Sequence, residues 1–178
     1  MVKNGVLLTV VMLVVSCVVG KDLEAYNRRT GAKFLKEKES EPGVYKLPSG
    51  MLFKVLSKGK GDLSPRADDP CEVHYSGTLR DGKKFDSSYD RGAPATFKPT
   101  QVIKGWTEAL QLMREGDKWE VYIPYNLAYG EHGSPPRIPG YSPLVFQMEL
   151  LKVKSGGKPA SDADAAIKAA IGKDYADL

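Results

Sequence analysis

The chain has 178 residues, a length that allows one globular domain with extensions but not two full domains. Hydrophobic residues make up 42% of it and charged residues 27%, which excludes a disordered polar chain and a fibrous repeat. The 26 basic residues are interleaved with 22 acidic ones, for a net charge of +4. Because no basic patch results, nucleic acid is not expected as a partner.

The first 20 residues have the layout of a secretory signal peptide. Lys3 precedes an uncharged run whose apolar centre is Val6 to Val15, and small residues follow up to Gly20. An uncleaved anchor helix is the alternative, but the run falls short of the roughly 20 apolar residues that a membrane span needs. Cys17 also stands where a bacterial lipoprotein carries its lipid. We therefore expect a secreted or cell-surface protein, with a membrane as partner only if the N-terminus is retained or lipidated.

Cysteine and histidine usage gives no sign of a metal or redox site. Cleavage after Gly20 leaves Cys71 as the single cysteine, so no intramolecular disulfide is expected. Neither His74 nor His132 has a second histidine or cysteine at metal-ligand spacing. Gly59-Lys60-Gly61 lacks the strand and helix that flank a phosphate-binding loop. We expect no metal and no cofactor.

In the first half of the chain, residues 21–43 are charged and helix-permissive and end at Pro42-Gly43, which predicts a solvated helical arm. Residues 51–56 favour a strand. Across residues 71–79 apolar and polar side chains alternate, the period of a half-buried strand. Arg80-Asp81-Gly82 predicts a turn directly after it.

The segment 105–113 has a helical period instead, since apolar residues from Trp106 to Met113 fall at i, i+3, i+4 and i+7. We expect this helix to stop at Gly116, a common glycine terminator. Alternation returns over residues 118–123 and 144–153, which predicts two more strands.

Residues 124–143 contain too many prolines and glycines for regular structure, and their length indicates a functional loop. Residues 155–159 are predicted to be a linker, and an alanine-rich helix is predicted to follow with Ser161 as its cap. The sum is an α+β fold, an antiparallel sheet around one short amphipathic helix with helical N- and C-terminal arms. We expect a signal peptide at 1–20, an arm at 21–43, one domain at 44–154 and a linker with a helical tail at 155–178.

Aromatic side chains are unusually dense in the central domain. Taken singly, each is most simply a core residue. Tyrosines in the proline-rich loop fit that interpretation less well, since loops lie on the surface. The sequence shows no nucleophile, base and orienting group at catalytic spacing. The aromatic set is Tyr75, Phe85, Tyr89, Phe97, Trp106, Trp119, Tyr122, Tyr125, Tyr129, Tyr141 and Phe146.

Five short motifs occur in the order seen in FKBP-type peptidyl-prolyl cis-trans isomerases, which the chain therefore resembles over about Tyr45 to Lys154. Residues 94–97 and 106–113 are most similar to the secreted macrophage infectivity potentiator (Mip) branch. The motifs are VHYSGTL (73–79), GKKFDSS (82–88), QVIKGW (101–106), AYG (128–130) and LVF (144–146).

The resemblance implies a half-barrel sheet wrapped around a short helix, with an apolar pocket between them. Trp106 is expected at the floor of this pocket. Its implied aromatic walls are Tyr75, Phe85, Phe97 and Phe146. Val102 and Ile103 are expected to line its rim, and Ile138 is expected to contribute from the proline-rich loop.

The resemblance also implies a few polar contacts. The backbone N–H of Ile103 and the hydroxyl of Tyr129 are expected to bind carbonyl oxygens of the peptide. Asp86 is expected to be the one charged group that faces the substrate, held by Arg91. Together with Phe146, these residues (Asp86, Tyr129 and Ile103) form the expected catalytic set.

Two positions depart from the family pattern. Ala95 stands where many members carry an aromatic residue, which opens one wall, and Ser134 stands where some carry a histidine. The preference for the residue before proline and the affinity for drugs are therefore left open. The long dimerising helix of many Mip proteins is not expected here, so the chain is predicted to be a monomer.

The function implied is catalysed rotation about Xaa-Pro bonds, without cofactor, by a secreted folding or virulence-associated factor. Proline-containing peptides and proteins are the expected partners, with the macrolides tacrolimus and rapamycin as inhibitors. Two alternatives stay open: a chaperone that grips proline-containing segments without turnover, and a surface interaction module whose terminal arms carry the function. If the enzyme interpretation holds, both arms should be dispensable for activity.

Overall fold

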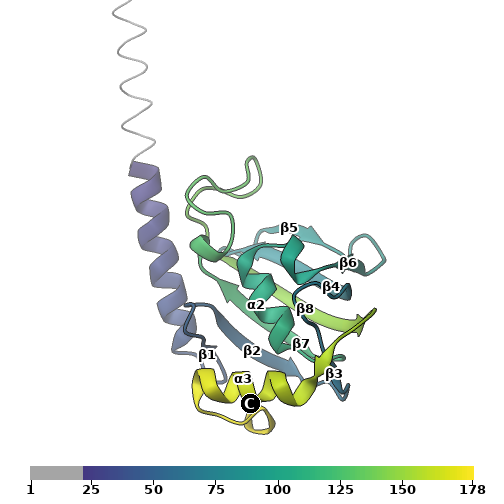
Figure 1. The fold of residues 1–178 in the computed structure, drawn as a ribbon. Coiled ribbons are helices and arrows are strands. Elements are labelled where there is room, and N and C mark those ends of the chain that lie inside the picture. The colour runs from purple at the N-terminus through teal and green to yellow at the C-terminus, as the bar shows by residue number, and fades with distance from the viewer. Residues whose placement is uncertain (1–21) are drawn as a thin grey trace, which may run out of the picture.

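The computed structural model describes residues 22–178 (Figure 1). The predicted signal peptide and Cys17 lie outside the described residues. No helix in the described range is long and apolar enough to cross a membrane.

The main sheet is antiparallel throughout, and its strands at 71–79, 118–123 and 144–153 lie where alternation predicted them. The predicted strand at 51–56 is observed one residue later. Short strand β6 (Ala95–Phe97) pairs with β4 beyond the region that β5 covers. The strand order is β1 (Tyr45–Lys46), β2 (Leu52–Ser57), β7 (Lys118–Ile123), β8 (Leu144–Val153), β4 (Cys71–Leu79) and β5 (Lys84–Ser87).

Helix α2 (Lys104–Leu112) packs against one face of this sheet (Figure 1). It buries Trp106, Ala109 and Leu110, and the alternate residues of β4 that face it are buried as well. A Cβ atom at Gly105 would lie 2.5 Å from Cγ2 of Ile123, so the glycine lets the helix approach β7 closely. The 3-10 turn η1 (Pro99–Gln101) precedes this helix.

The prediction that this helix ends at Gly116 is wrong. The helix is capped at Met113 in extended conformation, and Gly116, with φ of 88°, lies in the turn that leads to β7. That turn is closed by a hydrogen bond from the Asp117 N–H to the Arg114 carbonyl at 3.0 Å. The helix ends early because the chain must reverse before β7 begins at Lys118.

The predicted linker at 155–159 contains strand β9 (Lys158–Pro159), which pairs with β3 (Leu63–Ser64). Helix α3 (Ala160–Ile171) follows with Pro159 at its N-cap and no side-chain cap bond. Ser161 therefore lies inside the first turn, and its predicted capping role is wrong. The Ala160 N–H instead donates to the Asp62 carbonyl at 2.8 Å, which satisfies a backbone group at the helix start.

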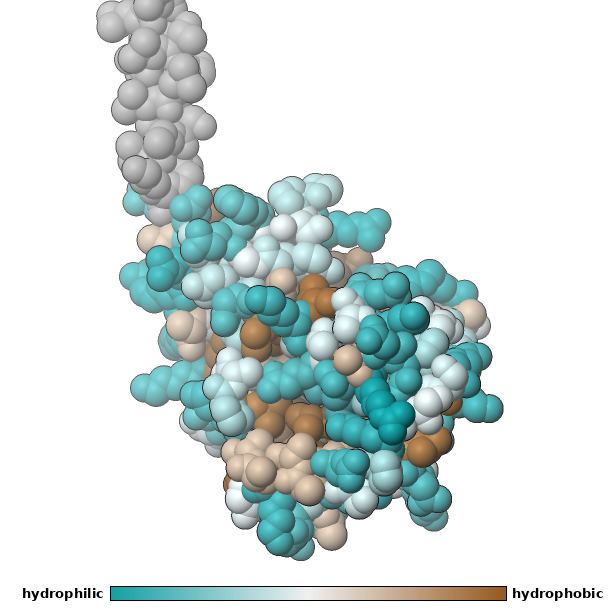
Figure 2. All heavy atoms as spheres, viewed as in Figure 1, coloured by the Kyte–Doolittle hydropathy of each residue, from teal (hydrophilic) through white to brown (hydrophobic). Residues whose placement is uncertain are grey.

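The C-terminal segment packs into the core. Ile167 of α3 is fully buried, and Tyr175, in the 3-10 turn η3 (Tyr175–Asp177), is 6% exposed. The Tyr175 hydroxyl donates to the buried Asp117 carboxyl, and Arg114 forms an ion pair with Asp164 of α3. In Figure 2 the outer side of α3 adds a weakly apolar patch to an otherwise largely hydrophilic face.

Residues 22–39 form the predicted N-terminal helix, but one side of it is docked rather than solvated. It lies alongside the sheet, on the side away from β5 and β6 (Figure 1). The Asn27 amide donates to the Gly140 carbonyl at 3.2 Å. The ring of Phe34 meets the ring of Tyr122 edge-on, with 6.3 Å between centroids. This contact covers Tyr122, which β7 presents on the sheet face opposite α2 and which is 1% exposed.

The predicted functional loop, residues 124–143, is irregular as expected. It contains only the short 3-10 turn η2 (Tyr125–Leu127) and an isolated bridge between Ser134 and Ile138. This bridge consists of two backbone hydrogen bonds of 2.8 and 3.0 Å, so the tip of the loop is closed on itself.

Candidate active site

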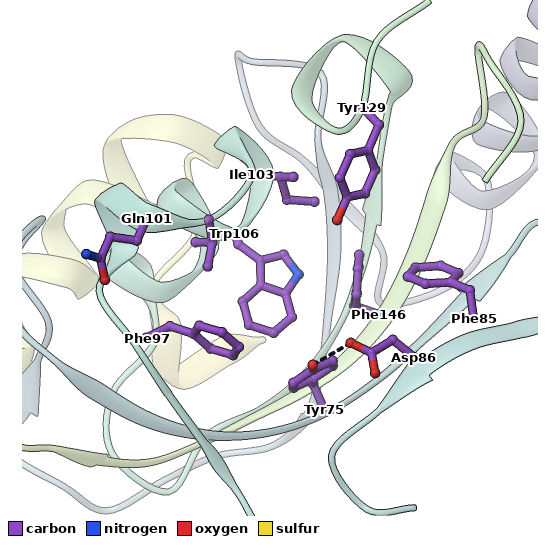
Figure 3. Close-up of a pocket in the computed structure, with 10 residues that line it drawn as sticks. Tyr75, Phe85, Asp86, Phe97, Gln101, Ile103, Trp106, Tyr129 and Phe146 are labelled. Carbon is purple, nitrogen blue, oxygen red and sulfur yellow. Dashed lines mark hydrogen bonds between the residues drawn. The ribbon is translucent and has the colours of Figure 1, made fainter. Parts of the chain in front are cut away.

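A cavity of about 520 Å³ opens between α2 and the sheet (Figure 3). Its lining includes nine of the eleven residues that the resemblance proposed and adds Gln101. The lining residues are Tyr75, Phe85, Asp86, Phe97, Gln101, Val102, Ile103, Trp106, Tyr129 and Phe146.

Trp106 forms the floor of this pocket. As a residue of α2 it points toward the sheet, where the rings of Tyr75, Phe97 and Phe146 all meet its indole nearly at right angles. The centroid distances are 4.9, 5.6 and 5.2 Å, and the interplanar angles are 84°, 89° and 83°. Edge-to-face contacts of this kind hold rings in defined orientations. The floor is therefore a rigid aromatic surface, and the indole is only 4% exposed.

Gly77 makes the far wall possible. A Cβ atom there would lie 2.6 Å from Cε1 of Phe146 and 2.8 Å from Cζ of Phe85. These two rings also pack edge to face, with centroids 5.5 Å apart. Two aromatic side chains thus fill the space that any side chain at position 77 would need.

Asp86 is the one acidic residue in the pocket lining, and three donors converge on its carboxylate. The Tyr75 hydroxyl donates at 2.6 Å and the Ser87 N–H at 2.9 Å, while Arg91 forms an ion pair with it. Arg91 also donates to the Tyr75 hydroxyl at 2.7 Å. The predicted role of Arg91 in holding Asp86 thus agrees with the geometry, although Arg91 itself does not line the pocket.

These contacts fix the protonation states at the pocket. Partial burial raises the pKa of Asp86, but the hydrogen bonds from Tyr75 and Arg91 and the charge of Arg91 outweigh it, so the pKa lies below its usual value. Burial and the nearby Asp86 charge raise the pKa of Tyr129. The pocket therefore holds an ionised carboxylate and a protonated phenol.

Two donors at the mouth have no partner among the described residues. Ile103 is the N-cap of α2, and its backbone N–H donates to no carbonyl of the described chain. Tyr129, 42% exposed, comes from the proline-rich loop, and its hydroxyl points into the pocket in Figure 3. Both are in place to bind carbonyl oxygens of a peptide.

Besides Arg91, three residues that the resemblance singled out lie away from this lining. Ile138 is 5% exposed and belongs to an adjoining hollow, which Ser134 also lines. Ala95, on β6, lines neither space. Gln101, which no sequence pattern singled out, reaches the rim because η1 directs it there.

The described part of the chain contains no group of three or more histidine, cysteine or acidic side chains that could hold a metal ion. Cys71 is fully buried, and burial raises the pKa of its thiol to about 12. A thiol in this state is protonated and inert as a nucleophile.

The fold agrees with comparisons to known proteins. Residues 61–151 match the family of FKBP-type peptidyl-prolyl cis-trans isomerases. The chain belongs to this family. It is 56% identical over 133 residues to the macrophage infectivity potentiator of Trypanosoma cruzi, which covers 75% of this chain and 68% of that protein. To the outer membrane protein MIP of Legionella longbeachae it is 45% identical over 128 residues, 72% of this chain and 54% of that protein.

Among solved structures, FkpA from Escherichia coli superposes with a TM-score of 0.75 at 36% identity, covering 90% of this chain and 75% of that one. The α+β fold, the enzyme class and the likeness to Mip proteins predicted from the sequence are thereby confirmed.

Proposed function

We propose that this FKBP-type isomerase accelerates rotation about Xaa-Pro bonds without a covalent step, with the proline ring on Trp106. The observation that carries the proposal is a pocket with aromatic walls whose only carboxylate is held in place by three donors. The inert state of Cys71 agrees with a mechanism that uses no nucleophile.

The barrier arises from amide resonance, which makes rotation cost roughly 18 to 20 kcal/mol. The planar amide separates more charge than the twisted one. A pocket that replaces water with aromatic rings therefore destabilises the planar state relative to the twisted state. Trp106, Tyr75 and Phe146 supply this apolar surface.

The polar groups then orient the peptide. The free N–H of Ile103 and the hydroxyl of Tyr129 bind carbonyl oxygens on the two sides of the proline. Asp86 lies next to the rotating carbonyl, and the donors from Tyr75 and Arg91 prevent its carboxylate from following the rotation. Its fixed field favours the twisted geometry over the planar one.

A short Xaa-Pro peptide assay tests the proposal. The wild type should accelerate cis-trans exchange, and Phe146→Ala should reduce kcat/KM by at least about tenfold because water enters the pocket. Leu151→Ala, on the same strand β8 but outside the pocket, is the matched control. Circular dichroism confirms folding, and Phe146→Leu serves if the alanine variant unfolds. Saturable peptide binding without exchange would show a binding module instead of an enzyme.

The same pocket is proposed to bind the macrolides tacrolimus and rapamycin. The floor and most walls are in place, and Ala95 lies outside the lining. Both compounds should therefore change the fluorescence of Trp106 saturably and inhibit the peptide reaction. A Trp119→Phe background isolates the signal, since Trp119 is fully buried in the core. Intact activity without any saturable change would contradict this assignment.

We also propose that the chain is exported and acts on proline-containing proteins outside the cytoplasm. The support is the signal-like order of basic, apolar and small residues at 1–20. Mass spectrometry of the protein tests this: cleavage after Gly20 gives a soluble form, a lipid on Cys17 an anchored one, and an unprocessed N-terminus on a protein from the membrane fraction an anchor helix. An unprocessed protein recovered only from the cytosol contradicts export.

A further inference from the structure

A second hollow of about 370 Å³ adjoins the aromatic pocket. The two spaces share Phe85, Asp86 and Tyr129, so a peptide seated in the first can continue into the second without leaving the surface. The remaining lining comes entirely from residues 134–138 of the proline-rich loop.

Arg137 gives this second hollow a positive charge. Its guanidinium donates only to the Phe85 carbonyl, at 3.3 Å, and no carboxylate of the described residues lies within 4 Å of it. Asp86, the one acid in the lining, is already neutralised by Arg91. One uncompensated cation therefore faces the hollow.

The loop holds the backbone of Arg137 in place before any peptide binds. Ser134 and Ile138 exchange two backbone hydrogen bonds of 2.8 and 3.0 Å on either side of it. Ile138 anchors the turn, since it is 5% exposed and belongs to the hydrophobic core. A cation on a backbone held in this way binds a ligand at a lower entropic cost than one on a free loop.

The position of Asp86 decides which part of a substrate enters the second hollow, and this step rests on the proposed function. The rotating carbonyl belongs to the residue before proline and lies beside Asp86. Because the second hollow begins at Asp86, the residue before proline is directed into it. We propose that Arg137 binds an acidic side chain at this position, so that the enzyme prefers Glu-Pro and Asp-Pro over neutral Xaa-Pro sequences.

Isosteric peptides test this proposal. Wild-type kcat/KM should be about two- to five-fold higher for a Glu-Pro peptide than for the matching Gln-Pro peptide at low ionic strength, the range of an exposed ion pair. Arg137→Gln should bring this ratio to about one, Arg137→Lys should keep part of it, and Arg137→Glu should favour Lys-Pro. Added salt should lower the wild-type ratio. Arg29→Gln, on the N-terminal helix and outside both linings, removes the same charge and should leave the ratio unchanged.

A Leu-Pro peptide separates the two levels of the argument. If every variant turns over Leu-Pro but the Glu-to-Gln ratio is the same with and without Arg137, this inference is wrong and the proposed function stands. If Leu-Pro is not turned over by the wild type, both fail. A preference that depends on Arg137 but requires the acid after the proline would overturn the assignment to the preceding residue.

Discussion

Asp86 is held by side chains that come from two other places in the chain. Tyr75 reaches it from β4 and Arg91 from the segment after β5, and each also contacts the other. The carboxylate can therefore neither rotate freely nor take up a proton easily. This fixed charge is the feature that distinguishes the pocket from an ordinary aromatic core.

Replacing Asp86 tests how much of catalysis depends on that charge. We expect Asp86→Leu to lower kcat/KM on a short proline peptide by about 100-fold, which corresponds to about 2.7 kcal/mol of transition-state stabilisation. Asp90→Leu is the matched control, because Asp90 forms an exposed ion pair with Lys84 and lies outside the pocket lining. Its effect should stay within about twofold. Equal losses in the two variants would argue for a general effect of surface charge.

The pH dependence follows from the same contacts. The pKa of Asp86 lies below its usual value and that of Tyr129 above it, so neither group titrates near neutrality. With an uncharged substrate, kcat/KM should be flat from about pH 5 to about pH 9, given ordinary values near 3.9 and 10. On the acid side, activity should fall as the pH drops through the lowered pKa of Asp86. The stability that the ionised Asp86 contributes should be lost over the same range. A midpoint near pH 6 would implicate another group.

The site was predictable mainly through motif resemblance and only weakly through local pattern. Alternation on β4 correctly places Tyr75 on the buried face, but no period in the sequence reveals that Arg91 turns back to Asp86. Gln101 was missed because a polar residue in a short 3-10 turn carries no signal. Arg137 was missed because its role depends on how the loop closes, which is a tertiary property.

At the scale of elements, the C-terminal helix is part of the domain. Alanines dominate α3, so its buried face is defined by little more than Ala163 and Ile167, four residues apart. The sequence pattern indicates only an alanine-rich tail, whereas the structure places Ile167 and Tyr175 in the hydrophobic core. Strands β4, β7 and β8 were predicted because alternation repeats over six residues or more. Strands β1, β3 and β9 have two residues each and cannot show a period.

Ile167→Ala tests whether α3 contributes to the stability of the domain. The side chain is fully buried, so its truncation should lower the free energy of unfolding by about 2 to 4 kcal/mol. Urea denaturation measures this value. The exposed Ala165→Gln on the same helix should change it by only a few tenths of a kcal/mol. A loss below about 0.5 kcal/mol for Ile167→Ala would show that α3 docks only weakly.

On the scale of the whole molecule, the two terminal segments differ in their relation to the core. The N-terminal helix covers Tyr122 and contacts the proline-rich loop through Asn27, but none of its residues lines the aromatic pocket. The C-terminal segment forms a hydrogen bond with Asp117 and an ion pair with Arg114, both at the turn before β7. We therefore expect only the N-terminal helix, and not the C-terminal segment, to be dispensable for activity.

Starting the chain at Glu41 tests that difference. Activity on a short peptide should stay within about threefold, because the pocket is untouched. Thermal stability should fall, since exposing Tyr122 and losing its contact with Phe34 should cost about 1 to 3 kcal/mol. Differential scanning calorimetry and the peptide assay, run on one preparation, measure both quantities. A folded protein with activity reduced more than tenfold would show that the helix shapes the pocket through the loop.

The pairing of β4 with β8 sets the time at which this enzyme becomes active during its own synthesis. Tyr75 and Gly77 form their wall with Phe146, whose strand is paired with β4 along its full length. Since chains are made from the N-terminus at about 5 to 20 residues per second, residues 71–79 wait several seconds for their partner strand. No pocket exists on the nascent chain before β8 has emerged. The catalyst is therefore silent until synthesis has passed Val153, the last residue of β8.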